Sequence, residues 1–197
     1  MRSSIILAGG KGSRLNGNKA LTLLCGRPLY TYSLEAASKV AEEVILVVKK
    51  GDFRIDGVEL AFDPLPESSP LVGIYSGLLK VRGEYTLVLP CDSPFLKPEL
   101  LERLFEEADG FDAAIPIWRN GNIEPLISVY KSDAMLEASG SALKKGCSSP
   151  REAIALLKKV NYVDVEGLRR YDPKLMSFFN VNTEADLELA ERILGCK

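Results

Sequence analysis

The stretch Ser4-Ile5-Ile6-Leu7-Ala8-Gly9-Gly10-Lys11-Gly12-Ser13-Arg14 decides the fold, because an apolar run passes directly into a glycine-rich, basic turn. Residues 4–8 predict a short buried strand. Glycines directly after such a strand let the backbone approach a ligand closely, and successive exposed amides can surround phosphate oxygens. Lys11, Arg14 and the nearby Lys19 add three cations. The stretch therefore predicts a strand followed by a polyphosphate-binding loop.

Two widespread phosphate-binding loops do not match this one. A Walker A loop would place its lysine one position earlier than Lys19 and follow it with Ser or Thr. The dinucleotide pattern G-x-G-x-x-G fails because Gly12 is followed by Ser13-Arg14-Leu15. The structural alternative is an ordinary glycine-rich turn with solvated lysines.

Hydrophobic periodicity predicts alternating strands and helices after this loop. Up to Ile117 the expected strands are residues 4–8, 43–49, 58–62, 85–89 and 112–117, and the expected helices are residues 29–40, 71–81 and 98–108. The near-continuous apolar strand at 43–49 indicates a sheet covered on both faces. This order predicts an α/β fold, a three-layer αβα sandwich with a mostly parallel, Rossmann-like sheet.

The second half of the chain is less regular. It predicts strands at 126–130, 162–165 and 178–181, and helices at 133–143, 150–159 and 184–194, the last with Thr183 as its N-cap. No repeat, linker or low-complexity tract interrupts the chain, so one domain over residues 1–197 is expected.

Composition excludes several function classes. The 25 Lys and Arg against 27 Asp and Glu offer no basic excess for a nucleic acid backbone. The longest aliphatic run, residues 44–48, is far shorter than the ~20 apolar residues that cross a bilayer, and no secretory segment is recognisable. A cytoplasmic protein with a small soluble substrate is expected, without nucleic acid or membrane partners.

Histidine is absent from the chain. Catalysis must therefore use carboxylates, Lys, Arg, backbone amides or a hard metal ion. The four cysteines lack C-x-x-C spacing and are expected to be reduced thiols: Cys25, Cys91, Cys147 and Cys196.

A second motif, Leu87-Val88-Leu89-Pro90-Cys91-Asp92-Ser93-Pro94, ends another apolar strand. Asp92 would lie just beyond the carboxyl end of this strand, where open α/β sheets bind ligands. Mg²⁺ is usually held by one or two carboxylates together with substrate phosphate oxygens and water, which suits Asp92. The alternative role is a turn cap before Pro94.

Two further sets of polar residues follow predicted strands. Asn180 and Asn182 would point to the same side of an extended segment, since side chains repeat every two residues, and could enter one crevice. Helix capping together with Thr183 is the alternative. Asp63 ends another strand, with the turn at Pro64 as its alternative role.

Together these motifs resemble the molybdenum cofactor guanylyltransferases, within the nucleotidyltransferases of nucleotide-diphospho-sugar transferase fold. The resemblance runs from Ile5 to Leu194 and includes a Pro-Leu-x-Gly helix start at residues 70–73 and a Pro-Leu strand at residues 124–130. The opening loop departs from the usual Met-Gly-x-Asp-Lys, because residues 15–19 read Leu-Asn-Gly-Asn-Lys. Val47 or Val48 also stands where an Asn often follows the second strand.

The resemblance implies transfer of GMP from GTP to the terminal phosphate of molybdopterin, with release of pyrophosphate. It implies nucleotide contacts by the following residues: Leu7, Ala8, Gly9, Gly10, Lys11, Lys19, Asp63 and Asp92. Asp92 would also bind Mg²⁺, and Asn180 and Asn182 would lie where the pterin and the reacting phosphates meet. Transient contacts with other cofactor-biosynthesis proteins are compatible with this role.

The implied chemistry is one displacement at the α-phosphorus, which needs no strong base because the attacking phosphate oxygen is already an anion. Lys19, Asp92 and Arg14 would be catalytic, with Arg14 and Lys11 holding the leaving pyrophosphate. A guanylyltransferase acting on adenosylcobinamide phosphate and a cytidylyl- or sugar-phosphate nucleotidyltransferase are enzyme alternatives. A non-catalytic nucleotide-binding module is the alternative of another class.

Overall fold

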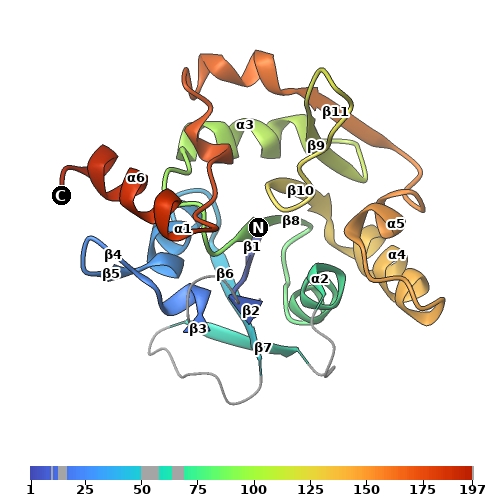
Figure 1. Cartoon of the computed structure of the whole chain (residues 1–197). Coiled ribbons are helices and arrows are strands. Elements are labelled where there is room, and N and C mark those ends of the chain that lie inside the picture. The colour runs from blue at the N-terminus through green and yellow to red at the C-terminus, as the bar shows by residue number, and fades with distance from the viewer. Residues whose placement is uncertain (10, 13–16, 50–57, 64–68, 197) are drawn as a thin grey trace.

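A seven-stranded sheet in the order β11-β9-β10-β8-β1-β6-β7 forms the middle layer of the computed structural model, which describes residues 1–9, 11–12, 17–49, 58–63 and 69–196 (Figure 1). Its strands are β1 (Arg2–Leu7), β6 (Glu43–Lys49), β7 (Glu59–Asp63), β8 (Tyr85–Pro90), β9 (Ala113–Ile117), β10 (Ser128–Lys131) and β11 (Val160–Asp164). Only β10 runs antiparallel to its neighbours in this sheet. The expected mostly parallel sheet is confirmed.

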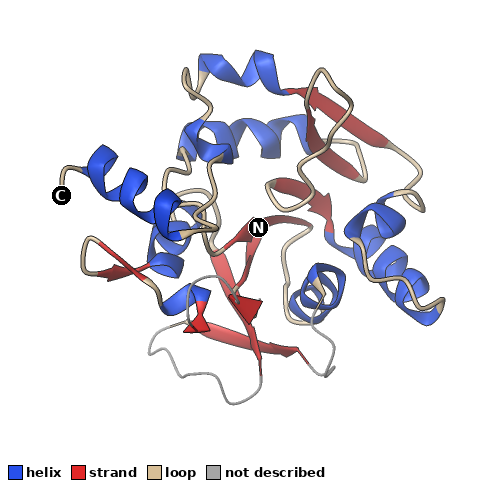
Figure 2. Ribbon diagram, viewed as in Figure 1, coloured by secondary structure: helices blue, strands red, loops and turns tan. Residues whose placement is uncertain are grey.

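Helices cover both faces of the sheet (Figure 2). On one face α1 (Leu29–Ala37) and α3 (Pro98–Ala108) pack over Ile6, Leu46 and Leu89. On the other, α2 (Pro70–Leu78), α4 (Ser132–Lys144) and α5 (Pro150–Ile154) pack over Ile5, Ile45 and Val88. Neighbouring residues of one strand point to opposite faces, so both faces bury apolar side chains and the fold is the predicted three-layer sandwich.

Shorter elements surround the carboxyl edge of the sheet. Two of them are small two-stranded antiparallel sheets. One pairs β2 (Lys11–Gly12) with β3 (Gly17–Asn18), and the other pairs β4 (Leu23–Leu24) with β5 (Arg27–Pro28). Three 3₁₀ helices, η1 (Lys19–Leu21), η2 (Val165–Arg170) and η3 (Met176–Phe178), join the larger elements, and α6 (Glu184–Leu194) closes the described chain. Across the described residues, no helix combines the length and the apolarity that crossing a bilayer requires.

Helix α2 approaches the central strand closely. A Cβ built on Gly77 would lie only 2.7 Å from Cγ2 of the fully buried Ile5. A glycine is needed here because the helix backbone lies almost directly on the strand.

The strand expected at residues 178–181 was wrong. The chain there leaves η3 and crosses the carboxyl edge of the sheet, and the Val181 amide donates to the Asp92 carbonyl at 2.9 Å. The helix expected at 150–159 ends at Ile154, because the following turn must deliver the chain to β11 and Asp112 accepts from the amides of Lys158 and Lys159, both at 2.9 Å.

The expectation of four reduced cysteines was also wrong. Cys25, between β4 and β5, is joined to Cys196 after α6 by a disulfide with a Cα–Cα distance of 5.7 Å. The two residues are 171 positions apart, so their spacing in the sequence carries no sign of the pairing. Cys91 and Cys147 are free thiols.

Candidate active site

The site lies at the carboxyl ends of the two central strands. Leu7 of β1 is in register with Pro90 of β8, and the Cys91 amide continues the pairing by donating to the Leu7 carbonyl at 3.3 Å. The glycine-rich stretch that follows β1 and the Asp92 motif that follows β8 therefore leave the sheet side by side.

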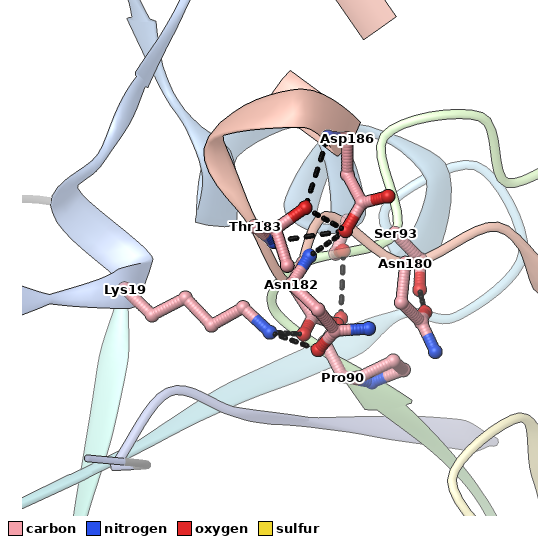
Figure 3. A network of polar contacts seen from close by, with 9 residues as sticks. Lys19, Pro90, Ser93, Asn180, Asn182, Thr183 and Asp186 are labelled. Atoms are coloured by element: carbon pink, nitrogen blue, oxygen red, sulfur yellow. Dashed lines mark hydrogen bonds and ion pairs between the residues drawn. The ribbon is translucent and has the colours of Figure 1, made fainter. Parts of the chain in front are cut away.

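Lys19 connects these two segments. It begins η1, where the neighbouring Ala20 is completely buried. Its Nζ contacts Asp92 Oδ2 as an ion pair and donates to Asn182 Oδ1 at 2.7 Å (Figure 3). Only 17% of the Lys19 side chain and 14% of the Asp92 side chain are exposed. The structure therefore brings Lys19, Asp92 and Asn182 together in one place.

Asp92 presents a second oxygen with no partner. Its Oδ1 is buried and makes no hydrogen bond within the described chain, although burying an unsatisfied carboxylate oxygen is costly. No group of three His, Cys, Asp or Glu side chains among the described residues could hold a metal ion unaided. One carboxylate beside an amide oxygen fits a Mg²⁺ ion that takes its other ligands from substrate phosphates and water.

The segment 178–182, here called the strap, is fixed at every residue. Two aromatic contacts hold its first half: Phe178 on Trp118 at 5.4 Å between ring centroids and Phe179 on Phe95 at 5.7 Å. The second half makes polar and buried contacts: Asn180 with Ser93, Val181 with Asp92 and Asn182 with Lys19.

The side chains of Asn180 and Asn182 contact site residues rather than cap a helix. Ser93 Oγ, on a completely buried residue, donates to Asn180 Oδ1 at 2.6 Å, and Figure 3 shows the Asn182 amide at the end of the Lys19 side chain. Thr183 caps α6 instead, through a capping box in which its hydroxyl accepts from the Asp186 amide. The side chains of both asparagines are therefore available to the site.

Asp186 holds the start of α6 in place. Burial by itself would raise the pKa of its carboxyl. Hydrogen bonds from the Thr183 hydroxyl and from the amides of Asn182 and Thr183 outweigh this effect, so the pKa lies below its usual range. A carboxylate at a helix N-terminus is also favoured by the helix dipole.

Cys91 borders the site without a chemical role. Burial raises the pKa of its thiol to about 12, with the Asp92 carboxylate adding to the effect. The thiol is protonated at neutral pH and is not a nucleophile.

The other predicted site residues vary in how far the structure places them. Leu7 ends β1, Ala8 donates to the Val47 carbonyl at 2.8 Å, and Gly9 follows at the same edge. The backbones of Lys11 in β2 and Asp63 at the end of β7 are described, but their side chains are not. Gly10 and Arg14 lie outside the described residues.

Several residues around the site were not among the predicted site residues. Ser93 stood in the quoted Cys-Asp-Ser-Pro motif, which was the available signal. The aromatic supports of the strap carry no such signal, because Phe95 and Trp118 come from separate loops and meet Phe179 and Phe178 only in the folded chain.

The order of the sheet and the lysine–aspartate pair at its carboxyl edge are those of a nucleotidyltransferase of nucleotide-diphospho-sugar transferase fold. The structure of 2-C-methyl-D-erythritol 4-phosphate cytidylyltransferase from Thermus thermophilus shares this fold, with a TM-score of 0.73 and 22% identity over 98% of each chain. The family model described as MobA-like NTP transferase domain matches residues 4–160.

The nearer relatives are more specific. A probable molybdenum cofactor guanylyltransferase of Methanosarcina mazei is 38% identical over 95% of this chain and 88% of its own length. The molybdenum cofactor guanylyltransferase of Desulfosudis oleivorans is 33% identical over 96% and 94%. Molybdopterin-guanine dinucleotide biosynthesis protein A from Archaeoglobus fulgidus superimposes over 100% of both chains, with a TM-score of 0.84 and 30% identity. The chain belongs to the molybdenum cofactor guanylyltransferase family.

Proposed function

We propose that this enzyme transfers GMP from GTP to the terminal phosphate of molybdopterin and releases pyrophosphate. The observation that carries the proposal is the meeting of Lys19, Asp92 and Asn182 at the end of the two central strands. One cation, one carboxylate and one amide at this place match the needs of phosphoryl chemistry. The names of the relatives favour molybdopterin as the acceptor over adenosylcobinamide phosphate.

The donor nucleotide belongs on the β1 side of Asp92. The backbone after Leu7 leaves the sheet there, and its glycines permit close approach to phosphates. Lys11 and Arg14 follow in the same loop, which is why we assign them to the departing pyrophosphate.

We assign a Mg²⁺ ion to Asp92, with its unpartnered Oδ1 as the support for this assignment. When bound, such an ion neutralises phosphate charge and aligns the reacting oxygens. Asp92 would hold it together with the phosphates, and Asn182 Oδ1, which contacts the same lysine as Asp92, would be a further oxygen ligand.

The reaction forms a bond from an acceptor phosphate oxygen to the α-phosphorus and breaks the bond to pyrophosphate. The attacking oxygen is already anionic, so a chain without histidine lacks nothing that this step requires. Lys19 Nζ would donate to the α-phosphoryl oxygens as charge moves onto them. Asn182 and Asp92 keep the lysine aimed at that position.

Thermal unfolding with GTP, CTP, ATP or UTP, each with and without Mg²⁺, tests the donor, because a ligand that binds the native state raises its stability. We expect the largest rise with GTP and Mg²⁺, and pyrophosphate release only when molybdopterin is added. A preference for CTP would overturn the assignment of the donor. GTP binding without pyrophosphate release would indicate the non-catalytic module.

We further propose that the enzyme works in the cytoplasm and makes transient contacts with other cofactor-biosynthesis proteins. The small soluble substrates and the balanced charge of the chain support this location. Fluorescent tagging of the full chain, followed by cross-linking in cells, tests both statements.

A further inference from the structure

The ribbon that follows β9 carries an aromatic and carboxylate pair that the proposed chemistry does not use. An antiparallel bridge between Ile117 and Ile123 holds the ribbon together, and the Trp118 amide donates to the Asn122 carbonyl at 2.8 Å. Trp118 Nε1 donates to Glu124 Oε1 at 2.6 Å. Both side chains are half-buried.

This pair lies at the same edge of the sheet as Asp92. Val129 of β10 is paired with both Leu87 of β8 and Ala114 of β9, so Pro90 and Ile117 lie level with each other. Trp118 is then level with Cys91, two strand spacings away, which is about 10 Å. A small molecule can span that distance from the reacting phosphates.

The pair is held rigidly and is joined to the site by packing. The Trp118 ring meets Phe178 edge to face, and Phe178 begins the strap whose Asn180 accepts from Ser93, next to Asp92. Glu124 Oε2 makes no hydrogen bond within the described chain. A fixed aromatic ring beside a carboxylate with a vacant oxygen is suited to a flat heterocycle that presents N–H donors.

We propose that Trp118 and Glu124 bind the 2-amino-4-oxopyrimidine ring of the acceptor pterin. The amino group and the adjacent ring N–H of this ring lie on one edge and can donate to the Glu124 carboxylate. Guanine carries the same edge. The sheet order separates the two ligands: the glycine-rich loop leaves β1, whereas β9 lies on the opposite side of β8. This assignment rests on the proposed function, which places GTP on the β1 side.

The test uses Trp118 as its own probe, since it is the only tryptophan in the chain. Neopterin monophosphate, a stable phosphorylated pterin, is titrated into the full chain while tryptophan fluorescence is followed, with and without saturating GTP. We expect saturable quenching that GTP does not abolish, and an affinity about 10–100-fold weaker in Glu124→Gln, the loss typical of hydrogen bonds to a charged group. The affinity for GTP should stay within twofold. Glu137→Gln, an exposed glutamate on α4, is the matched control.

Steady-state kinetics provide the second measurement. Trp118→Leu and Glu124→Gln should raise KM for molybdopterin and leave KM for GTP unchanged, with unfolding temperatures like that of the parent chain. Unchanged pterin affinity and unchanged acceptor KM in Glu124→Gln would overturn the inference, and so would a loss of GTP affinity, which would mean that the carboxylate binds guanine. If the parent chain itself releases no pyrophosphate, the proposed function fails, whereas the fluorescence titration still decides whether Trp118 and Glu124 bind a pterin.

Discussion

Lys19 Nζ donates to Asn182 Oδ1 across 2.7 Å, although the two residues are 163 positions apart in the chain. The contact joins the segment that follows the glycine-rich loop to the strap that precedes α6. Since Lys19 also contacts Asp92, the lysine is positioned from two sides before any ligand arrives. Preorganised charges of this kind need no rearrangement during the reaction.

Asn182→Ala should lower kcat by about 10-fold or more, because the lysine loses one of its two restraints. Stability should change little, since Thr183 and Asp186 still cap α6. Thr183→Ala gives the opposite pattern, with a loss of about 1 kcal/mol in unfolding free energy and a smaller effect on kcat. Pyrophosphate release and urea unfolding measure the two quantities. Wild-type kcat in Asn182→Ala would show that the contact has no catalytic role.

Asp92→Asn should lower turnover by about 100-fold or more, the scale seen when one preorganised electrostatic group is lost. The unfolding temperature should fall somewhat, because the substitution removes the charge partner of Lys19, whose side chain is only 17% exposed. The added stabilisation by Mg²⁺ in the presence of GTP should disappear. Asp109→Asn, at an exposed position after α3, is the control. Turnover close to the parent rate would exclude Asp92 from the mechanism.

Glu43→Gln should destabilise the protein by about 1.5–3 kcal/mol at neutral pH, because Glu43 is buried and accepts from the Ser3 hydroxyl and the Arg82 amide. The Arg82 guanidinium contributes little, since 74% of that side chain is exposed. Burial raises the pKa of Glu43, but the hydrogen bonds from Ser3 and Arg82 outweigh it and lower the pKa below its usual value.

The pKa of Glu43 is lower in the folded state than in the unfolded state. The stabilisation by its ionised carboxylate is therefore fully present above the pKa of the unfolded state, about 4.3, and is lost as pH falls through the pKa of the folded state. The difference between Glu43→Gln and the parent chain should therefore shrink below about pH 4. Urea unfolding at several pH values measures it. Glu35→Gln, which breaks only exposed ion pairs, should show no comparable loss. A pH-independent difference would contradict the ionised role of Glu43.

Gly77→Ala should cost about 1–3 kcal/mol of unfolding free energy, because the new methyl group would overlap Ile5 in the core. Gly167→Ala is the matched control, since a Cβ there meets nothing within 4 Å and the backbone angle φ is not positive. The control should be neutral or slightly stabilising. Equal effects of the two substitutions would contradict the close approach of α2 to β1.

Reduction of Cys25–Cys196 should lower the free energy of unfolding by about 2–4 kcal/mol, since the bond closes a loop of 171 residues. The double variant Cys25→Ser with Cys196→Ser should match the reduced protein and no longer respond to reductant. Cys147→Ser leaves the disulfide intact and serves as the control. An unfolding temperature of the parent chain that does not change when reductant is added would contradict a structural role for the disulfide.

The local sequence was sufficient to predict a helix or strand wherever one short-range pattern was strong. The strand at Glu43–Lys49 and the helix at Pro98–Ala108 have the predicted bounds, because a continuous apolar run and an amphipathic period with Pro at the start need no distant partner. The helix at Glu184–Leu194 is likewise set by its Thr183 cap. Asp92 and Lys19 could be selected from motifs because catalytic loops follow strand ends.

Residues 178–182 show the limit of such prediction. A strand was predicted for residues 178–181, but the Val181 amide donates to the carbonyl of Asp92, nearly ninety positions earlier in the chain by the residue numbers. Large separations in the sequence likewise conceal the bond between Cys25 and Cys196 and the packing of Trp118 on Phe178.

The amino-acid sequence by itself determined the layers, most of the elements and the chemical types at the strand ends, because these depend on periodicity and on neighbours a few residues apart. Only the tertiary structure decided which asparagine meets Lys19, which Asp92 oxygen stays unpartnered and which cysteines join. Such pairings depend on how distant loops settle against one another over the sheet edge, and no short-range pattern encodes that geometry.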